Sequence, residues 1–380
     1  MILHAERLWC RPGGATDGPP AVGSRGPWVV CAALVVGALM VPAPRAHGAG
    51  SDADVSAARL PPDRVRTLVE RFRRARTEAD REAAATELLA GGPGAAATLA
   101  TAARAELSRL RQPYAARFQR AATDVLKSRW REGDVSRVAE LRQTILDVAA
   151  AEGLTKETIV ARSDPALESL ERLLSVTPAD VLAADPKLAA DRSTLVALDD
   201  VARRCAAVMP VPERTVGADV VPARVADDLA AAEELACLLA GPLTPADRQT
   251  VAANAGRARD LDPEEARGMV RLNLIRVLVG LPAQAIDPGL VAACRVHSRD
   301  MEERGFFAHE SPVSGRETPW RRAEAAGTSA SAENIFSGSE EGTAAIRSWW
   351  HSPGHHKNML GRQSRTGLGR WKGFWTQLFG

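Results

Sequence analysis

The chain has 380 residues, of which 45% are hydrophobic and 25% are charged, a composition typical of a folded globular protein rather than a disordered one. Its length predicts roughly two or three domains. The formal net charge is only +2, so electrostatics give no support for binding to nucleic acid or for general attraction to an acidic membrane surface.

The N-terminal 50 residues contain an apolar stretch that is typical of a targeting signal. The run from Trp28 to Val41 follows Arg25 and is shorter than the roughly 20 residues that a membrane-spanning helix needs. We therefore interpret residues 1–50 as a signal peptide or, if it is not cleaved, as an N-terminal membrane anchor. This predicts an exported protein of the extracellular space or cell envelope, with membrane contact only through an uncleaved segment.

Residues 51–265 are predicted to form an all-α region of unknown role. Apolar residues recur at helical spacing between Asp63 and Ala90. A second helix is expected to end near Leu110, and Pro113 is expected to start another, because proline disrupts the interior of a helix. The alternation of apolar and polar residues that is typical of strands is hard to find here.

Charge is divided unevenly within this helical region. Residues 64–142 carry 17 basic and 10 acidic side chains, whereas residues 143–265 carry 12 and 22. One interpretation is a basic face for polyanions such as wall polymers. The interpretation that we prefer is that the two halves attract each other within one helical bundle.

Three cysteines follow the N-terminal segment, Cys205, Cys237 and Cys294. Cys205 and Cys237 could pair across two helices in an exported protein, but three is an odd number and no metal-ligand spacing is present. We expect all three to be small buried residues.

Histidine and aromatic residues are concentrated near the C-terminus. Five of the seven histidines lie between His297 and His356, and ten of the sixteen aromatic residues follow residue 305. A chain packed in one style throughout would not show this distribution. We therefore place a chemically different domain at residues 266–380.

Two helices are predicted at the start of this domain. The first has an N-cap, a first-turn proline and acidic residues from Asp262 to Glu265, and Gly280 provides its C-terminal stop. The second should begin after Asp287 and end at Gly305.

Three short strands are predicted further along the chain. Glu333 to Phe336 can form one strand, and the ranges 365–371 and 374–379 can form a hairpin with Lys372-Gly373 at its turn. Both faces of this hairpin carry apolar groups, so helices should cover both faces.

Several motifs follow one another along this part of the chain. They are Asn273-x-x-Arg276, His297-Ser298 with Met301, Gly305-Phe306-Phe307-Ala308-His309, Ala332-Glu333-Asn334-Ile335, Trp350-His351-Ser352-Pro353-Gly354-His355, and Phe374 to Gly380. The C-terminal third of the chain thus resembles the CAP (SCP-like) superfamily of sperm-coating proteins, cysteine-rich secretory proteins, antigen 5 and plant pathogenesis-related proteins. The resemblance implies an α+β fold, an α-β-α sandwich with a small antiparallel sheet between helical layers, preceded here by the all-α region.

The resemblance also implies a cleft with two histidines and two acidic residues. His309 matches the first histidine, and Glu333 matches the acidic residue of the Glu-Asn-Ile motif. The other two positions do not carry over, because the second acidic residue falls at Ser352 or Pro353 and the second histidine at Phe374.

As in similar bacterial domains, His355 could supply another imidazole to the same cleft. We therefore expect a ligand-binding cleft formed by His309, Glu333, His355 and Trp350, with His309 and His355 as ligands if a divalent metal such as zinc is bound. An N-cap at Ser352 and a first-turn proline at Pro353 should place His355 in the first turn of a helix, where partial positive charge disfavours an imidazolium. Glu333 would favour it, and the sequence leaves this opposition open.

Each of these residues has a plainer interpretation. His309 and Glu333 could hydrogen-bond each other in a structural role, and His297 is expected to be a buried imidazole on the core face of its helix. His351 and His356 are expected to be solvent-exposed neighbours. The Trp349-Trp350 pair is expected to be core and cleft wall, with a sugar platform as the alternative.

We expect an exported, non-enzymatic binding module whose cleft holds a metal ion, a lipid or a peptide, with a cell-envelope component as another conceivable partner. The alternative is a metal-dependent hydrolase or peptidase that uses Glu333 as general base. Two histidines are fewer than the three protein ligands of a usual catalytic zinc. The sequence also has no His-Glu-x-x-His helix and no Gly-x-Ser-x-Gly elbow.

Overall fold

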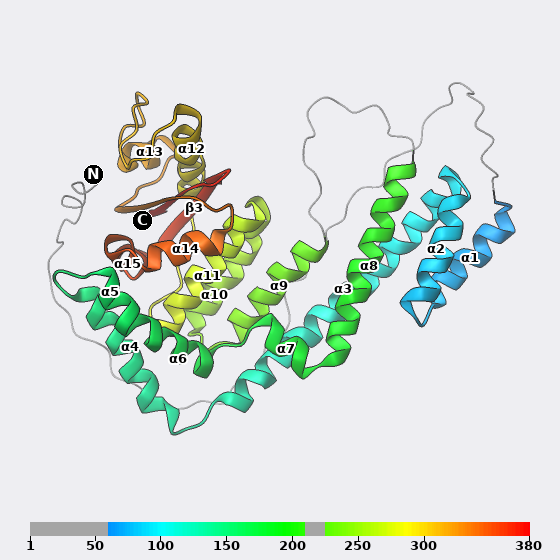
Figure 1. Ribbon diagram of the computed structural model, residues 1–380, viewed down its shortest axis with the longest axis horizontal. Helices are drawn as coiled ribbons and strands as arrows, with labels where there is room; N and C mark the ends of the chain where they lie inside the picture. Colours follow the sequence, from blue (N-terminus) through cyan, green and yellow to red (C-terminus); the bar gives the residue numbers. More distant parts are fainter. Residues whose placement is uncertain (1–59, 210–224) are drawn as a thin grey trace.

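The computed structural model describes residues 60–209 and 225–380, and the N-terminal segment expected to be a signal peptide or anchor lies outside these ranges. Figure 1 shows a bundle of long helices at one end of the molecule and a small sheet enclosed by helices at the other. Within the two ranges, no helix combines the length and the apolar character needed to cross a membrane.

All elements before residue 262 in the described ranges are helical, as predicted. The helices are α1 (Pro62–Arg74), α2 (Glu78–Ala90), α3 (Pro93–Arg129), α4 (Asp134–Ala150), α5 (Lys156–Thr158), α6 (Asp164–Leu174), α7 (Pro178–Ala184), α8 (Pro186–Val208), α9 (Val225–Ala240) and α10 (Pro245–Arg257). A π-helical turn, η1 (Ile159–Ser163), joins α5 to α6, and a 3-10 turn, η2 (Ala258–Asp260), follows α10.

The expected break at Pro113 is wrong, because α3 runs through this proline without interruption. The neighbouring side chains Tyr114 and Phe118 are buried in a cluster that includes Leu195 of α8 and Leu229 of α9. Proline inside a helix removes one hydrogen bond and is unfavourable by about 3 kcal/mol, so burial of these aromatic groups outweighs it. The periodic segment from residue 63 to residue 90 is also two helices, with Thr77 as the N-cap of α2.

Ion pairs join the basic and acidic halves of the helical region. Arg111 of α3 pairs with Asp228 of α9 at 3.0 Å, and Arg117 pairs with Asp185 at 2.8 Å. These contacts agree with the preferred interpretation that the two halves attract each other within one bundle. The three cysteines are free and buried, as expected.

The C-terminal part contains α11 (Pro263–Val279), β1 (Ala285–Ile286), α12 (Pro288–Arg304), α13 (Pro319–Ala325), β2 (Ala332–Ser337), α14 (Gly342–Trp350), α15 (Pro353–Met359), β3 (Arg365–Trp371) and β4 (Phe374–Phe379). The predicted ends of α11 and α12 are confirmed, since Gly280 and Gly305 follow them with φ of 88° and 68°. These left-handed conformations are readily adopted by glycine. The predicted hairpin is confirmed as β3 and β4.

The sheet has the strand order β1-β3-β4-β2 and lies between two helical layers. Helices α12 and α13 cover one face, and α11, α14 and α15 cover the other (Figure 1). The sandwich is therefore the one that the resemblance implied. The sheet is mixed rather than purely antiparallel, however, because β1 pairs with β3 in the parallel sense.

Apolar packing continues from the helical region into the sandwich, although the chain passes from α10 to α11 close to the expected boundary at residue 265. One cluster of buried side chains contains residues of α4, η1, α6, α11, α14 and β4; among them are Ile145, Ile159, Leu170, Leu272, Trp349 and Trp375. Helices α4 and α6 thus share a core with the sandwich that they lie against (Figure 1).

Candidate functional site

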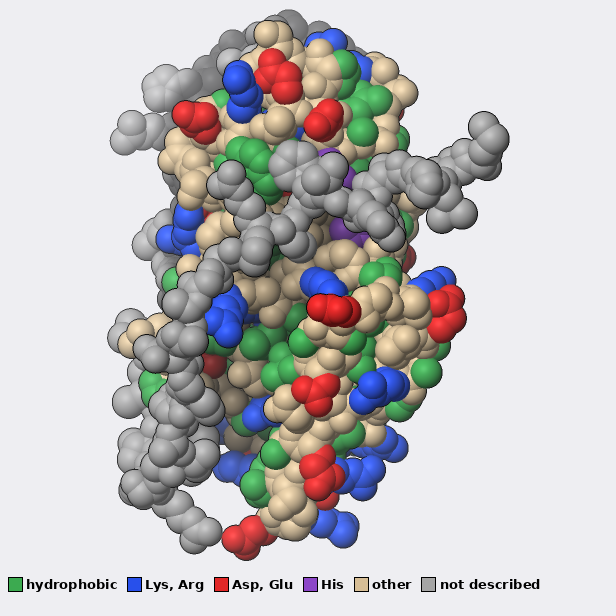
Figure 2. Space-filling view, turned by 90° about the vertical axis from the view of Figure 1, so that its left-hand side faces the viewer, with side chains coloured by type: hydrophobic (Ala, Val, Ile, Leu, Met, Phe, Trp, Pro, Cys, Tyr) green, Lys and Arg blue, Asp and Glu red, His purple; other side chains and the backbone are tan. Residues whose placement is uncertain are grey.

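Three of the four expected cleft residues are brought together from different elements. His309 lies five residues after α12 ends, Glu333 is the second residue of β2, and His355 is in the first turn of α15. Figure 2 shows histidine side chains, in purple, on the face of the molecule that lies at the left of Figure 1. The sheet and the two helical layers thus place residues from distant parts of the sequence at one site.

Glu333 is the centre of a hydrogen-bonded chain. Its Oε1 lies 2.9 Å from Nδ1 of His309, and its Oε2 accepts a hydrogen bond of 2.6 Å from Arg322 of α13. The side chain of Glu333 is 2% exposed and that of Arg322 is fully buried, whereas that of His309 is 41% exposed. The chain therefore runs from the interior of the domain outward to His309.

Arg322 is a site residue that sequence reasoning missed. Besides Glu333, its guanidinium donates to the backbone carbonyls of His309, at 3.0 Å, and Arg316, at 3.1 Å. It therefore supports both members of the His309–Glu333 pair. No local signal distinguishes it from the many other arginines of this chain, because its role depends on where α13 packs.

The hydrogen bonds determine the charge state of Glu333 and the tautomer of His309. Burial raises the pKa of Glu333, but the hydrogen bond from His309 and the charge of Arg322 together outweigh it and hold this pKa below its ordinary value. Against an ionised carboxylate, Nδ1 of His309 carries the proton and donates it. A neutral His309 then has its lone pair on Nε2, which makes no hydrogen bond within the described ranges.

His355 lies beside His309, with the centres of the two rings 6.3 Å apart. Its pKa is lowered to about 4, mainly by burial and further by His309, while Glu333 acts weakly in the opposite direction. His355 is thus neutral at pH 7, and the opposition left open by the sequence is decided by burial. The expected helix start at Pro353 is confirmed, although the side chain of Ser352 makes no capping hydrogen bond.

Trp350, the fourth residue expected in the cleft, is 4% exposed. Its Nε1 donates to Asp164 of α6 at 2.8 Å, so its indole faces the helical region. The neighbouring Trp349 is fully buried and donates to the carbonyl of Ile335. Neither ring offers an accessible surface for stacking a sugar.

The other three histidines of the C-terminal part, His297, His351 and His356, are all at least half-buried. His297 is buried as expected, and its Nε2 lies 3.0 Å from the carbonyl oxygen of Ala308. The expectation that His356 is exposed is wrong, because it is fully buried with its ring 4.3 Å from that of Trp350. His351 is half-buried, and its Nε2 lies 2.9 Å from Asp164.

Phe374 occupies the position at which the family has its second histidine, and it is paired with another aromatic residue. The ring of Phe374 lies 6.4 Å from that of Phe307, which is 53% exposed. An apolar surface therefore replaces an imidazole at this point.

No group of three or more His, Cys, Asp or Glu side chains in residues 60–209 and 225–380 is arranged to hold a metal ion.

Comparison with known proteins places a family relationship in the same part of the chain. Residues 270–370 match the model described as "CAP: Cysteine-rich secretory protein family". A crystal structure at 1.5 Å of an extracellular protein containing an SCP domain, from Bacillus anthracis strain Ames, is 31% identical. That match covers 37% of this chain and 44% of the other chain, with a TM-score of 0.29.

Two curated relatives come from Bacillus subtilis strain 168. The uncharacterized protein YkwD is 30% identical over 110 residues, which are 28% of this chain and 43% of YkwD. The uncharacterized membrane protein YlbC is 31% identical over 108 residues, which are 28% of this chain and 31% of YlbC. The chain spans less than half the length of either relative. The family match and the ordered motifs together identify the C-terminal part of this chain, residues 270–370, as a CAP domain of the cysteine-rich secretory protein family.

Proposed function

We propose that the cleft of His309, Glu333 and His355 is a binding site rather than a catalytic centre. The observation that carries this proposal is the engagement of Glu333, whose two oxygens accept hydrogen bonds from His309 and Arg322. A general base must be within reach of the proton that it removes and must be able to take it up. Glu333 instead orients His309, which is the member of the pair that is exposed.

A divalent transition metal such as zinc is the occupant that the two imidazoles suit best. Histidines that bind metals commonly donate their other ring N–H to a carboxylate, as His309 does to Glu333. This leaves Nε2 of His309 as a donor atom, and the neutral ring of His355 adds a second. Two protein ligands would leave coordination positions open for water or for a polar group of a lipid, a peptide or a cell-envelope component.

The alternative is a metal-dependent hydrolase or peptidase with Glu333 as general base. It faces two difficulties: Glu333 would have to leave a buried partner, and a third protein ligand of the kind a catalytic zinc usually has is missing from the described residues. Both difficulties favour a binding site over a hydrolase.

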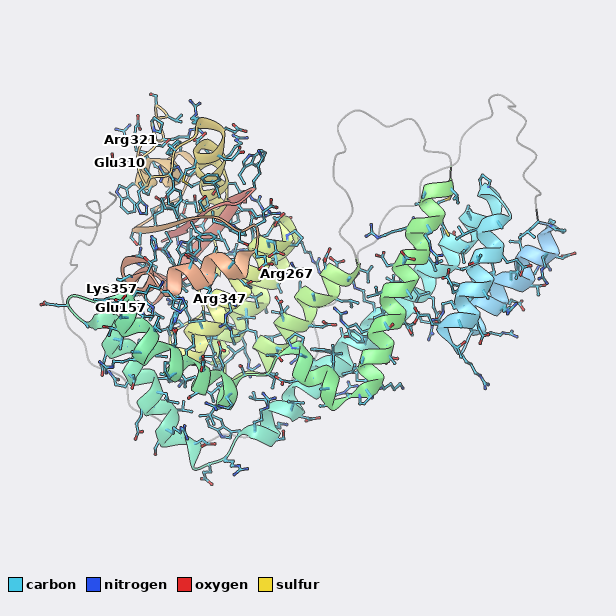
Figure 3. All side chains as sticks on the ribbon, viewed as in Figure 1. Glu157, Arg267, Glu310, Arg321, Arg347 and Lys357 are labelled. Carbon is cyan, nitrogen blue, oxygen red and sulfur yellow. The ribbon has the colours of Figure 1, made fainter. Side chains whose placement is uncertain are left out.

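The test uses the full-length protein and zinc chloride alone, with affinity and stoichiometry measured by isothermal titration calorimetry. We expect stoichiometric binding, and a loss of about tenfold or more in affinity for both His309→Ala and His355→Ala. Glu310→Ala is the matched control, because this exposed carboxylate adjoins His309 in sequence and lies in the outer layer of the domain (Figure 3). Equal affinity in all variants, or no stoichiometric zinc in the unmodified protein, would overturn the metal proposal.

We further propose that the protein is exported. The apolar run from Trp28 to Val41 supports this, as does the description of the relative YlbC as a membrane protein. N-terminal sequencing of the mature protein tests it, with cleavage or membrane retention expected. An intact Met1 in a soluble cytoplasmic fraction would contradict export.

A further inference from the structure

The helical region contacts the CAP domain close to the turn that carries His355. Helices α4 and α6 lie against α11, α14 and α15 (Figure 1), and they share one buried cluster with them. Ile145 of α4 and Leu170 of α6 belong to this cluster together with Leu272 of α11 and Met359 of α15. Both helices are therefore packed against the CAP domain and are not tethered loosely beside it.

Polar contacts from this interface converge on the end of α14. Asp164, the first residue of α6, accepts a hydrogen bond of 2.8 Å from Trp350 through Oδ1. Its Oδ2 lies 2.9 Å from Nε2 of His351. One carboxylate of the helical region thus holds two successive residues of the CAP domain, 186 and 187 positions further along the chain.

A second pair of contacts links Trp350 to the residue next to His355. Nδ1 of His356 lies 2.7 Å from the carbonyl oxygen of Trp350, and the two rings are 4.3 Å apart. His355 and His356 are adjacent in the short helix α15. A displacement of Trp350 would therefore be transmitted to α15 by packing and by a hydrogen bond.

Lys357 makes a further contact between α15 and the helical region. Its Nζ donates a hydrogen bond of 2.9 Å to the carbonyl of Ala151, directly after α4. Figure 3 shows Lys357 on the side of the CAP domain that faces the helical region. The contacts made by Asp164 and by Ala151 therefore both hold the turn and the helix that place His355 beside His309.

We propose that Asp164 is a positioning residue for His355, so that the helical segment of residues 134–174 helps to shape the cleft. The inference rests on the binding site proposed above, but it concerns the placement of His355 and not the identity of the ligand. The CAP domain's own contacts hold His309 through Glu333 and Arg322. In the part of the chain that the structure describes, no carboxylate is hydrogen-bonded to His355, whose placement depends on the position of α15.

The test compares Asp164→Ala with Glu171→Gln in the full-length protein. Glu171 of α6 pairs with Arg271 of α11 at 2.6 Å, so its substitution weakens the same interface without touching Trp350 or His351. Trp350→Phe, which retains an aromatic ring but loses the hydrogen bond to Asp164, is the second variant in case Asp164→Ala does not fold. Circular dichroism establishes that each variant is folded.

Two readouts separate this inference from the metal proposal. With histidines labelled with carbon-13 and no metal added, we expect the ring resonances of His355 to shift in Asp164→Ala and Trp350→Phe but not in Glu171→Gln. With zinc chloride as the probe, we expect Asp164→Ala to bind more weakly than Glu171→Gln, because only the former releases Trp350 and the turn before His355. If zinc does not bind to any variant, the metal proposal fails while the resonances still test the positioning role. Unchanged His355 resonances in folded Asp164→Ala and Trp350→Phe would overturn it.

Discussion

The guanidinium of Arg322 lies 2.6 Å from Oε2 of Glu333, and both side chains are almost completely buried. A buried ion pair of this kind contributes little net stability when intact, but loss of one partner leaves an uncompensated charge in the interior. Substitution of Glu333 should therefore lower stability far more than substitution of a carboxylate at the surface. It also keeps Glu333 ionised and turned toward His309.

Glu333→Gln is expected to lower the free energy of unfolding by about 3–5 kcal/mol, because Arg322 would remain buried without its counter-charge. Urea denaturation monitored by near-ultraviolet circular dichroism measures the effect. The matched substitution Glu310→Gln, at an exposed carboxylate, should change the value by less than about 0.5 kcal/mol. Equal stability of the two variants would mean that Arg322 finds another partner.

Stability is expected to fall as the pH is lowered from about 6.5 to about 4. Burial is the main cause that lowers the pKa of His297, His355 and His356 to about 4. In this window the unfolded chain binds protons that the folded chain does not, so the free energy of unfolding decreases with decreasing pH. Each histidine contributes a slope of at most about 1.4 kcal/mol per pH unit.

His356→Gln tests this origin of the pH dependence. It should reduce the slope between pH 6.5 and 4 without changing the region above pH 7, where all three imidazoles are neutral in both states. The pKa of the Glu333 carboxyl group is lowered in the folded chain. Its contribution to stability is therefore complete above the ordinary pKa of glutamate and is lost only as the pH falls below that value. A slope in His356→Gln that matches the unmodified protein would assign the effect to other groups.

Arg276→Met is expected to destabilise the CAP domain by about 3 kcal/mol or more, because buried carbonyl groups would lose their donor. The buried guanidinium of Arg276 donates to three carbonyl oxygens, those of Pro282, Met359 and Gly361, at 2.8–2.9 Å. Thermal unfolding measures the change, and the exposed Arg347→Met serves as control. A melting temperature equal to that of the control would show that these carbonyls are satisfied by water.

Gly369→Ala is expected to destabilise the sandwich by about 1–3 kcal/mol or more, because the added methyl group would collide with the backbone of α12 at Cys294 and Arg295. Gly354→Ala is the matched control, since the corresponding space is open and the residue lies in the first turn of α15. The control should be neutral or stabilised by up to about 1 kcal/mol. Denaturant midpoints of the two variants compare them directly, and a tolerated Gly369→Ala would show that α12 can move away from β3.

Much of the CAP domain could be predicted from local sequence signals. Asp262 as a cap and Gly280 as a stop defined α11, and Asp287 and Gly305 did the same for α12. Lys372-Gly373 located the hairpin turn. Capping and turn formation depend on residues only a few positions apart, so the sequence carries these signals without knowledge of the fold.

The candidate site was predictable only in part. The family motifs pointed to His309, Glu333 and His355, and the structure brings these three together. Local sequence could not reveal Arg322, because its position depends on how α13 packs over the sheet. Nor could it reveal the contact of Trp350 with Asp164, which joins residues 186 positions apart.

The sequence by itself therefore determined the helical character of the first part of the chain, most helices and strands of the CAP domain, and three residues of its candidate site, but not β1, α13 or α14. Tertiary structure alone decided that α3 continues through Pro113 and that His356 is buried. It also decided that the helical region shares a core with the CAP domain. The physical reason is that burial and pairing depend on contacts between distant elements, and these contacts can outweigh local preferences by several kcal/mol.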